Sequence, residues 1–262
     1  MPEGKTLLLV IDIGNTNITL GVYRRGEIVA RWRLTTGPQR TADEYDVLLS
    51  GLFRSQGLSP MDVEGIAIAC VVPPLLPTFQ ALSQKRFGVD PLVVKPGIRT
   101  GVRIRIDNPR ELGADRLVNA VAVQRLYGTP AIVIDFGTAT TFDVVSAEGD
   151  YLGGAIAPGI GISAEALFRY TAQLPRIELN LPPSSIGHNT IHSMQSGVLY
   201  GYVGLVEGLV ARIEEELGTK ARVVATGGLA NLIASQTKVI EVVDENLTLE
   251  GLRLIYEMNR RG

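Results

Sequence analysis

An approximate internal repeat constrains the fold of this chain more strongly than any other feature of its sequence. Residues 7–34, LLLVIDIGNTNITLGVYRRGEIVARWRL, align with residues 131–158, AIVIDFGTATTFDVVSAEGDYLGGAIAP. Each copy has an apolar strand that ends in Asp-x-Gly, a turn rich in Thr and Asn, and two further strands joined by a hairpin around Gly. The repeat predicts two similar lobes, each opening in an antiparallel three-stranded meander, although a chance similarity of two strand-turn-strand units is the alternative.

The rest of the chain alternates short apolar runs with longer helical patterns. This order favours an α/β fold in which each lobe has a mixed sheet with flanking helices. We place the boundary in the helix after GADR, which divides the chain into lobes 1–118 and 119–262. Further strands are expected at residues 65–72, 90–94, 221–228 and 238–243, and helices at 42–56, 114–128, 194–218 and 247–261.

The composition indicates a globular protein and argues against two classes of partner. Hydrophobic residues make up 45% of the chain, but no run reaches the ~18 apolar residues that a membrane span requires. The formal charge is −2, without the basic stripe or helix-turn-helix pattern typical of nucleic-acid binding. Cys70, the single cysteine, rules out an internal disulfide and favours a buried thiol over a nucleophile. We therefore expect a cytoplasmic protein with no membrane and no nucleic-acid partner.

The turn at residues 12–19, which follows the first strand, carries groups suited to phosphate binding. Gly14 lets the backbone approach a ligand closely, and the neighbouring Asn and Thr side chains add small donors. The Asp12 carboxylate repels phosphate, but it can hold Mg²⁺, usually through water, and the ion then bridges to the phosphates. Because the turn recurs at Asp135, the sequence predicts a nucleotide-phosphate clamp made by two turns, neither a P-loop nor a Rossmann motif. A hairpin in which Asp only caps backbone N–H groups is the alternative.

The GADR sequence, residues 113–116, offers the carboxylate that phosphoryl transfer to an alcohol requires. Such a carboxylate must lie within hydrogen-bond reach of the attacking hydroxyl, whose proton leaves as the bond to phosphorus forms. Asp115 follows Gly113 at the expected start of a helix. It therefore also fits a purely structural role, in which the helix dipole favours a carboxylate in the first turn and Arg116 pairs with Glu111 at the surface.

Three weaker signals leave their roles open. ATGGLA at residues 225–230 fits either a contact with adenine or ribose or a plain turn between strand and helix. His188 and His192 are interpreted as surface residues, because no carboxylate or thiol completes a metal site beside them. Small residues in the expected helix 194–218 predict close packing of another helix, including one across a dimer interface. They are Gly197, Gly201, Gly204 and Gly208.

Six motifs resemble, in order and spacing, those of type III pantothenate kinase, a family of the acetate and sugar kinase/Hsp70/actin superfamily. They are IDIGNTN, NPRELGADR, DFGTATTFD, GGAIAPG, HNTIHSMQSG and TGG, and the match runs essentially end to end. The resemblance implies two ribonuclease-H-like, actin-like ATPase lobes and phosphorylation of pantothenate by ATP, the first step of coenzyme A synthesis. It also implies a homodimer that requires Mg²⁺ and a monovalent cation, K⁺ or NH₄⁺.

The resemblance assigns roles to residues that contact each substrate. It implies that the Asp115 carboxylate accepts the proton of the pantothenate hydroxyl and that Asp135 binds the monovalent cation. Thr138 is implied as an ATP contact and Thr190 as a pantothenate contact. The implied residues that line the substrate are Gly113, Ala114 and Arg116. The implied first phosphate-binding loop comprises Asp12, Ile13, Gly14, Asn15, Thr16, Asn17, Ile18 and Thr19.

Two other functions and one departure from the family pattern stay open. An accessory protein would keep the nucleotide site and act by binding, and a different kinase of the superfamily would phosphorylate another small molecule. Intact Asp12, Asp115, Asp135 and Thr190 argue against a site that has lost its chemistry. Ile106 stands where members of the family often carry a tyrosine, which leaves the shape of the pantothenate pocket open.

Overall fold

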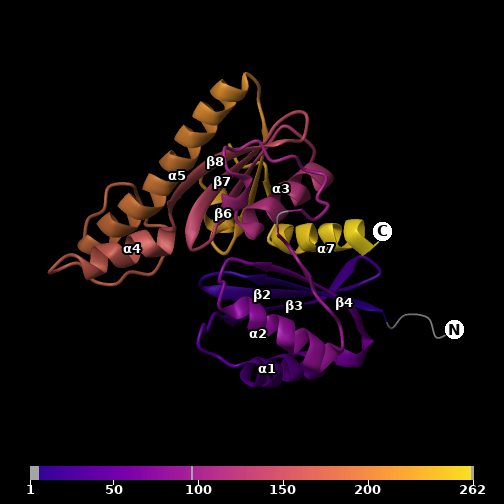
Figure 1. Ribbon diagram of the computed structural model, residues 1–262. Coiled ribbons are helices and arrows are strands. Elements are labelled where there is room, and N and C mark those ends of the chain that lie inside the picture. The colour runs from indigo at the N-terminus through magenta and orange to yellow at the C-terminus, as the bar shows by residue number, and fades with distance from the viewer. Residues whose placement is uncertain (1–5, 96, 261–262) are drawn as a thin grey trace. The chain divides into compact units, whose positions relative to one another are not determined.

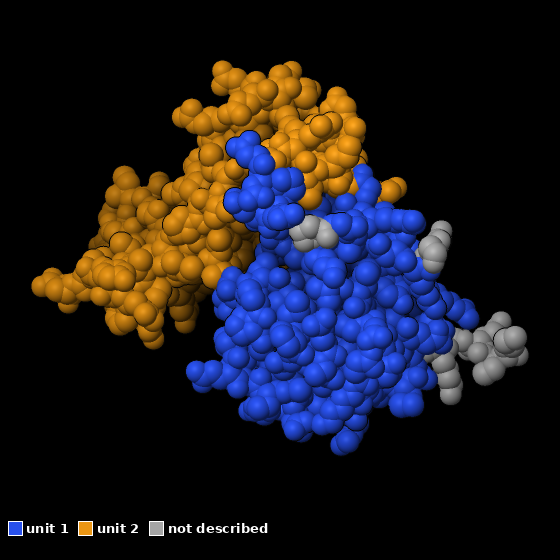
Figure 2. Space-filling model, in the orientation of Figure 1, with its two compact units in different colours: residues 1–101, 107–122, 248–262 blue, residues 102–106, 123–247 orange. Residues whose placement is uncertain are grey.

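The chain folds into two compact units, each with its own sheet and hydrophobic core (Figures 1 and 2). The structure, a computed structural model, describes residues 6–95 and 97–260. Unit 1 comprises residues 1–101, 107–122 and 248–262, and unit 2 comprises residues 102–106 and 123–247. The chain therefore returns to unit 1 for its last helix. The division into lobes 1–118 and 119–262 follows the two halves of the sequence repeat and stays a prediction.

Unit 1 contains a five-stranded mixed sheet in the order β3-β2-β1-β4-β5. Its first three strands form an antiparallel meander, and β4 and β5 extend the sheet in parallel. Helices α1 and α2 cover one face of this sheet and α7 covers the other (Figure 1). Alternate residues face opposite sides, so Ile11 and Ile13 pack with α1 and α2, whereas Val10 and Gly21 face α7. The strands are β1 (Leu7–Ile13), β2 (Asn17–Arg24), β3 (Glu27–Thr35), β4 (Val63–Cys70) and β5 (Leu92–Val93).

The helices of unit 1 begin at different kinds of start signal. A capping box opens α1, where the Thr41 N–H donates to Glu44 Oε2 (2.7 Å) and the Glu44 N–H donates to the Thr41 hydroxyl (3.4 Å). The chain crosses into unit 2 within α3, at Val123. The helices are α1 (Ala42–Ser55), α2 (Leu75–Leu82), α3 (Ala114–Leu126) and α7 (Leu247–Arg260), with 3₁₀ turns at Pro60–Asp62 and Pro109–Glu111 and a π turn at Ser83–Phe87.

Unit 2 repeats the arrangement of unit 1, with a five-stranded sheet in the order β10-β9-β6-β7-β8. Again three antiparallel strands form a meander and two parallel strands complete the sheet. The predicted α/β fold, with a mixed sheet that opens in a meander in each half, is confirmed. The elements are β6 (Ala131–Phe136), β7 (Ala139–Val145), β8 (Tyr151–Pro158), β9 (Arg222–Gly227), β10 (Val242–Val243), α4 (Ile160–Arg169), α5 (Thr190–Leu217) and α6 (Ala230–Ala234).

Some elements differ from the sequence expectation in length or presence. The strand expected at residues 238–243 is only the two-residue β10, and α2 and α4 were not among the expected helices. Neither α2 nor α4 has a side-chain cap, so the usual start signal is missing from the sequence. The long α5 ends as expected at Gly218, whose φ of 66° is left-handed. None of the helices in the described part of the chain is both long and apolar enough to span a bilayer.

Candidate active site

The turn between β1 and β2 is held closely to the end of β3. The Gly14 N–H donates to the Asn17 carbonyl (3.0 Å), and the Thr36 hydroxyl donates to the Gly14 carbonyl (2.6 Å). The Thr36 N–H also donates to the Thr16 carbonyl (3.0 Å). A Cβ atom at Gly14 would lie only 3.0 Å from the Asn17 carbonyl oxygen, so a side chain there would require the turn to shift by a few tenths of an ångström. The loop expected to bind phosphate is therefore a close-packed turn, with the side chains of Asn15 and Thr16 exposed.

The register of the first sheet places Asp12, Thr19 and Arg33 in one row across β1, β2 and β3. Directly paired residues of antiparallel strands project to the same face of a sheet, so all three side chains lie on the face opposite α1 and α2. Ile13 and Ile18, which the resemblance places in the phosphate loop, are buried in the core on the α1 side. These two residues offer only their backbone to a ligand.

Asp115 stands in the first turn of α3, with its carboxylate folded back over Gly113. Its Oδ1 atom accepts a hydrogen bond from the Arg116 N–H (2.8 Å) and would lie 2.6 Å from a Cβ atom at Gly113. Burial raises the pKa of the Asp115 carboxyl group, although the hydrogen bond from the Arg116 N–H opposes this shift. A carboxylate with a raised pKa is a stronger base than a surface carboxylate, as proton abstraction requires. Glu111 accepts a hydrogen bond from Asn108 Nδ2 (2.7 Å).

Asp12 and Asp115 lie at the same end of unit 1. The Val71 N–H donates to the carbonyl of Ile13, the residue after Asp12 (3.0 Å). A Cβ atom at Gly113 would lie 3.8 Å from Val71 Cγ1. The end of β1 and the turn that precedes Asp115 therefore share one neighbour. The structure thus brings the expected Mg²⁺ ligand and the expected proton acceptor to one region.

Cys70 lies beside this region, at the end of β4, and is half-buried. Burial raises the pKa of its thiol, the hydrogen bond that the thiol donates to the Val72 carbonyl (3.2 Å) opposes the shift, and the charge of Asp12 adds to the rise. The thiol therefore stays protonated at neutral pH and is a weak nucleophile. The raised pKa agrees with the expectation that Cys70 is not a nucleophile, although its side chain is only half-buried.

In unit 2, the carboxylate of Asp135 lies against two glycine turns. Asp135 is near the end of β6 and pairs with Thr141 on one side and Thr226 on the other. Its Oδ1 atom would lie 3.4 Å from a Cβ atom at Gly137 and 2.6 Å from one at Gly227, whose φ is +93°. The TGG motif, whose role the sequence left open, therefore packs on the carboxylate expected to bind the monovalent cation.

The turn that contains Thr138 also contacts the start of α4. Gly159 is the N-cap of α4, and a Cβ atom there would overlap the Thr138 carbonyl oxygen and lie 2.7 Å from that of Gly137. The Thr138 side chain itself is exposed. Gly159, the last residue of the GGAIAPG motif, therefore allows the chain after β8 to lie close to the turn expected to contact ATP.

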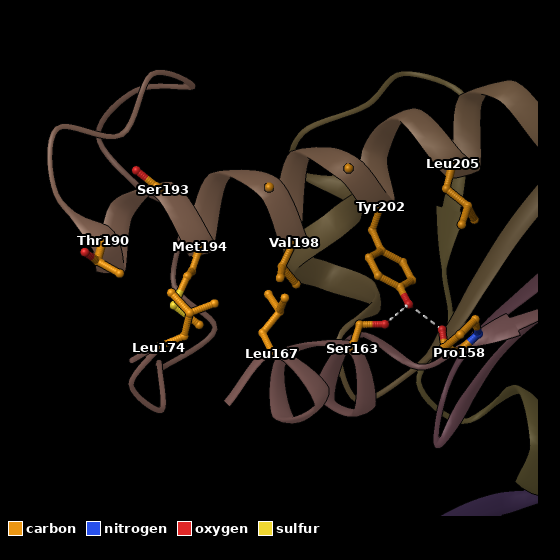
Figure 3. A pocket seen from close by; sticks show the side chains of 12 residues that line it. Pro158, Ser163, Leu167, Leu174, Thr190, Ser193, Met194, Val198, Tyr202 and Leu205 are labelled. Atoms are coloured by element: carbon orange, nitrogen blue, oxygen red, sulfur yellow. Dashed lines mark hydrogen bonds between the residues drawn. The ribbon is translucent and has the colours of Figure 1, made fainter. Parts of the chain in front are cut away.

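Thr190 begins α5 and lines a pocket of about 560 Å³ between α4 and α5 (Figure 3). Aliphatic side chains from the two helices point toward one another in this pocket. Toward its other end, the Tyr202 hydroxyl lies 2.8 Å from the Ser163 hydroxyl and donates to the Pro158 carbonyl (2.5 Å). The pocket is therefore mainly apolar, with polar groups at its ends.

The expected site residues belong to two different units of the chain. Asp12 and Asp115 belong to unit 1, whereas Asp135, Thr138 and Thr190 belong to unit 2. No cluster of three or more His, Cys, Asp or Glu side chains suited to a metal occurs in residues 6–95 and 97–260. A single carboxylate still fits Mg²⁺, which keeps several waters and takes its other ligands from substrate phosphates.

Comparison with known proteins identifies the family. The family model described as type III pantothenate kinase matches residues 8–212. The chain is 60% identical over 254 residues to the type III pantothenate kinase of Roseiflexus sp., which covers 97% of this chain and 100% of that protein. The chain belongs to the type III pantothenate kinase family. The kinase of this family from Moorella thermoacetica is 54% identical over 253 residues and covers 97% of this chain and 100% of its own length.

Solved structures share the fold of this type III pantothenate kinase family member at low sequence identity. A Baf family transcriptional activator from Campylobacter jejuni has a TM-score of 0.63 at 18% identity, covering 97% of this chain and 100% of its own. MreB 5 of Spiroplasma citri, bound to AMPPNP, has a TM-score of 0.55 at 10% identity, covering 98% and 97%. An ADPNP-bound dehydratase activator from Clostridium difficile has a TM-score of 0.56 at 13% identity, covering 98% and 97%. The predicted actin-like ATPase fold is confirmed.

Proposed function

We propose that this protein transfers the γ-phosphoryl group of ATP to the hydroxyl group of pantothenate, giving 4′-phosphopantothenate in the first step of coenzyme A synthesis. The observation that carries the proposal is the 60% identity to a type III pantothenate kinase over 97% of the chain. The placement of a partly buried carboxylate, Asp115, beside the end of β1 supports it, because a kinase for an alcohol needs a base next to its phosphate loop.

In this proposal the two Asp-Gly turns bind ATP. The turn at residues 12–19 binds phosphate through backbone N–H groups and small side chains, and Asp12 holds Mg²⁺ through water. When bound, Mg²⁺ neutralises charge on the phosphates. Thr138, exposed beside the start of α4, contacts ATP. Asp135 binds K⁺ or NH₄⁺, a role supported by the close approach of Gly137 and Gly227 to its carboxylate, which no side chain of these two residues covers.

In the same proposal Asp115 accepts the proton of the pantothenate hydroxyl. Gly113, Ala114 and Arg116 line the substrate, and Thr190 contacts it. Support comes from the direction of the pKa shift at Asp115, since burial makes this carboxylate a better proton acceptor.

Ile106, the departure from the family pattern, packs near Gly153 of β8, where a Cβ atom would lie 3.4 Å from Ile106 Cγ2.

An acceptor panel tests the proposed reaction. ADP release is measured with pantothenate, a set of sugars and a set of short hydroxy acids, with ATP and Mg²⁺ present. We expect release only with pantothenate. Turnover on another alcohol would indicate a different kinase of the superfamily, and no turnover on any acceptor would indicate an accessory protein that acts by binding.

We expect activity to depend on K⁺ or NH₄⁺ and this dependence to pass through Asp135. A weakly hydrated monovalent ion at this carboxylate adds positive charge near the triphosphate, so removing it weakens both ATP binding and turnover. Activity is titrated with KCl, with NaCl at equal ionic strength as the control. Replacing Asp135 by Asn is expected to shift the K⁺ titration to higher concentrations. Full activity without K⁺ or NH₄⁺ would contradict the site.

We also propose that the protein is a homodimer and works in the cytoplasm. Four glycines of α5 are exposed, and a Cβ atom at any of them would meet nothing within 4 Å; they are Gly197, Gly201, Gly204 and Gly208. Such a stripe of small residues suits the close approach of a second helix. Sedimentation of the purified protein measures the oligomeric state, and cell fractionation measures the compartment.

A further inference from the structure

The phosphate turn of unit 1 has no positive charge of its own, and one arginine of the neighbouring strands stands where that charge is needed. Residues 12–19 contain Asp12 and neither Lys nor Arg, so a triphosphate bound there would face a negative charge. Arg33 shares the cross-strand row of Asp12 and Thr19. Neighbouring strands are ~4.8 Å apart, so the row places Arg33 about 10 Å from Asp12, two strand spacings away.

The surroundings of Arg33 leave its charge available. Trp32 and Leu34 pack against the core on the α1 side, which directs Arg33 to the same face as Asp12. Its side chain is exposed, on the edge strand β3, and makes no hydrogen bond or ion pair with any residue that the structure describes. A planar guanidinium binds phosphate oxygens in pairs, so a strand-held arginine at this distance is suited to a phosphate on the turn.

We propose that Arg33 binds the phosphate oxygens of ATP at the turn of residues 12–19. The proposal rests on the phosphate-binding role of that turn, given above. Arg33 supplies in unit 1 the positive charge that kinases of other folds take from a lysine in their phosphate loop. Its contribution falls on the binding of nucleotide, while Asp115 acts on the acceptor hydroxyl.

Replacing Arg33 by Gln tests this role through direct nucleotide binding. Calorimetry with Mg·AMPPNP needs no acceptor, so it separates this proposal from that of the pantothenate reaction: a wild-type protein that fails to bind the analogue would contradict the proposed function, not only Arg33. We expect the Kd of Arg33→Gln to rise roughly 10- to 100-fold, the usual effect of losing a charged hydrogen bond. Arg33→Lys is expected to recover part of the loss because it keeps the charge without the fork.

The matched control is Arg25→Gln, which removes an exposed arginine from the hairpin between β2 and β3. This hairpin lies at the other end of the strands from the turn of residues 12–19, so the control is expected to leave the Kd unchanged. Equal Kd values for the wild type and Arg33→Gln would overturn the proposal. A rise confined to the KM for pantothenate would also overturn it, because the guanidinium would then bind the acceptor carboxylate.

A second and independent observation concerns the contact between α7 and α3. Thr248 Oγ1 donates a hydrogen bond to Oδ1 of Asn119 (2.8 Å), whose side chain is only 1% exposed. A Cβ atom at Gly251 would overlap the Val118 carbonyl oxygen, so the two helices touch through their backbones. Residues three and four positions apart share one face of a helix, which places Val118 and Asn119 one turn beyond Asp115.

Helix α7 is itself fixed on the first sheet. Leu249 Cδ1 would lie 3.1 Å from a Cβ atom at Gly21, and Tyr256 occupies the space where a side chain at Gly65 would project. Near the end of α7, the side chain of Asn259 accepts a hydrogen bond from the Arg99 N–H (3.1 Å) and donates one to the Arg99 carbonyl (2.8 Å). The helix that contacts the start of α3 is therefore held at several points along its length.

We infer that α7 holds Asp115 in position, with Thr248 and Asn119 as positioning residues that act through α3. The inference rests on the role of Asp115 as proton acceptor, proposed above. The hydrogen bond from Thr248 to the buried Asn119 side chain, one turn along α3 from Asp115, restrains the rotation of this part of the helix. Misplacing a base by about 1 Å can cost on the order of 100-fold in rate, so a small rotation is sufficient to change turnover.

Replacing Thr248 by Val removes the donor while keeping the shape of the side chain. We expect kcat to fall about tenfold with an unchanged KM for ATP, and the acidic limb of the pH profile of kcat/KM to move. Thr248→Ser, which keeps the hydroxyl, is expected to restore both. In an Asp115→Asn background the same substitution is expected to cost nothing further, because the group that it positions is gone.

Phe53→Leu is the control for stability alone, because Phe53 is buried on the other face of the first sheet. It is expected to lower the melting temperature without moving the pH profile. An equal loss of kcat from Thr248→Val in the wild-type and Asp115→Asn backgrounds would overturn the inference, as would an unchanged kcat. If Asp115→Asn alone were fully active, the proposed function of Asp115 would fail instead.

Discussion

Replacing Asp115 by Asn is expected to lower the turnover of pantothenate by roughly 10²- to 10⁴-fold, the usual contribution of a general base. The amide oxygen of Asn can still accept the hydrogen bond from the Arg116 N–H, so the geometry of the first turn of α3 is kept. ATP binding is expected to stay normal, because the substitution touches only the acceptor side. Steady-state kinetics with pantothenate and calorimetry with Mg·AMPPNP measure the two quantities separately.

The pH dependence supplies an internal check on this prediction. Burial raises the pKa of the Asp115 carboxyl group, and only its ionised form accepts a proton. The value of kcat/KM for pantothenate is therefore expected to fall as the pH drops through that raised pKa, at a higher pH than for an ordinary Asp. The residual activity of Asp115→Asn should lack this limb. Turnover close to that of the wild type in the variant would remove Asp115 from the base role.

The stability of the same variant is expected to change in the opposite direction from its activity. The pKa of Asp115 is higher in the folded than in the unfolded protein, so the folded state holds its proton more tightly. The free energy of unfolding therefore decreases as the pH rises from the unfolded pKa to the folded pKa, and the ionised form contributes least to stability. The neutral Asn does not carry this cost. The melting temperature of Asp115→Asn at neutral pH should therefore equal or exceed that of the wild type, which shows that lost turnover does not reflect unfolding.

Replacing Gly227 by Ala is expected to destabilise unit 2 by about 2–5 kcal/mol and to abolish most activity. The φ of Gly227 is +93°, which an L side chain adopts only with strain. In addition, the new Cβ atom would lie 2.6 Å from Asp135 Oδ1 and 2.7 Å from backbone atoms of Phe136. Chemical denaturation measures the free energy of unfolding, and the K⁺ titration of any folded fraction reports on Asp135.

Gly218→Ala is the matched control for this substitution. Gly218 also has a positive φ, +66°, but a Cβ atom there would meet nothing within 4 Å. Its replacement should cost only the backbone strain, about 1 kcal/mol. The difference between the two variants therefore measures the contact with Asp135 and Phe136. Equal losses of stability in Gly218→Ala and Gly227→Ala would mean that this contact carries no energy.

The two sheets could be predicted from the sequence because the signal for each is local and occurs twice. Every meander is one continuous stretch, with an Asp-x-Gly turn and a glycine hairpin that set its strands. The helices α2 and α4 could not be predicted this way, because their N-cap residues, Pro74 and Gly159, make no side-chain hydrogen bond to the first turn. Their formation depends on packing against the sheet and not on a start signal.

The site was predictable only where its residues are neighbours in the chain. The carboxylate of Asp115 and the turn after Asp12 stand out because each lies in a short motif. The approach of Gly227 to Asp135 depends on the parallel pairing of β6 with β9, which no local pattern records. The role proposed for Arg33 could not be predicted for the same reason. Its alternation with Trp32 indicates the face on which it lies, but only the register of three strands places it in a row with Asp12.

The return of the last helix to unit 1 has a consequence for the order of synthesis. A ribosome releases the strands of the first sheet early, yet α7, which covers one face of that sheet, begins only at Leu247. Until α7 has been synthesised, the nascent chain holds that face of its sheet uncovered, and the contact of Thr248 with Asn119 does not exist. A message that stops short of this helix therefore encodes a product with an incompletely covered sheet, however much of the earlier sequence it contains.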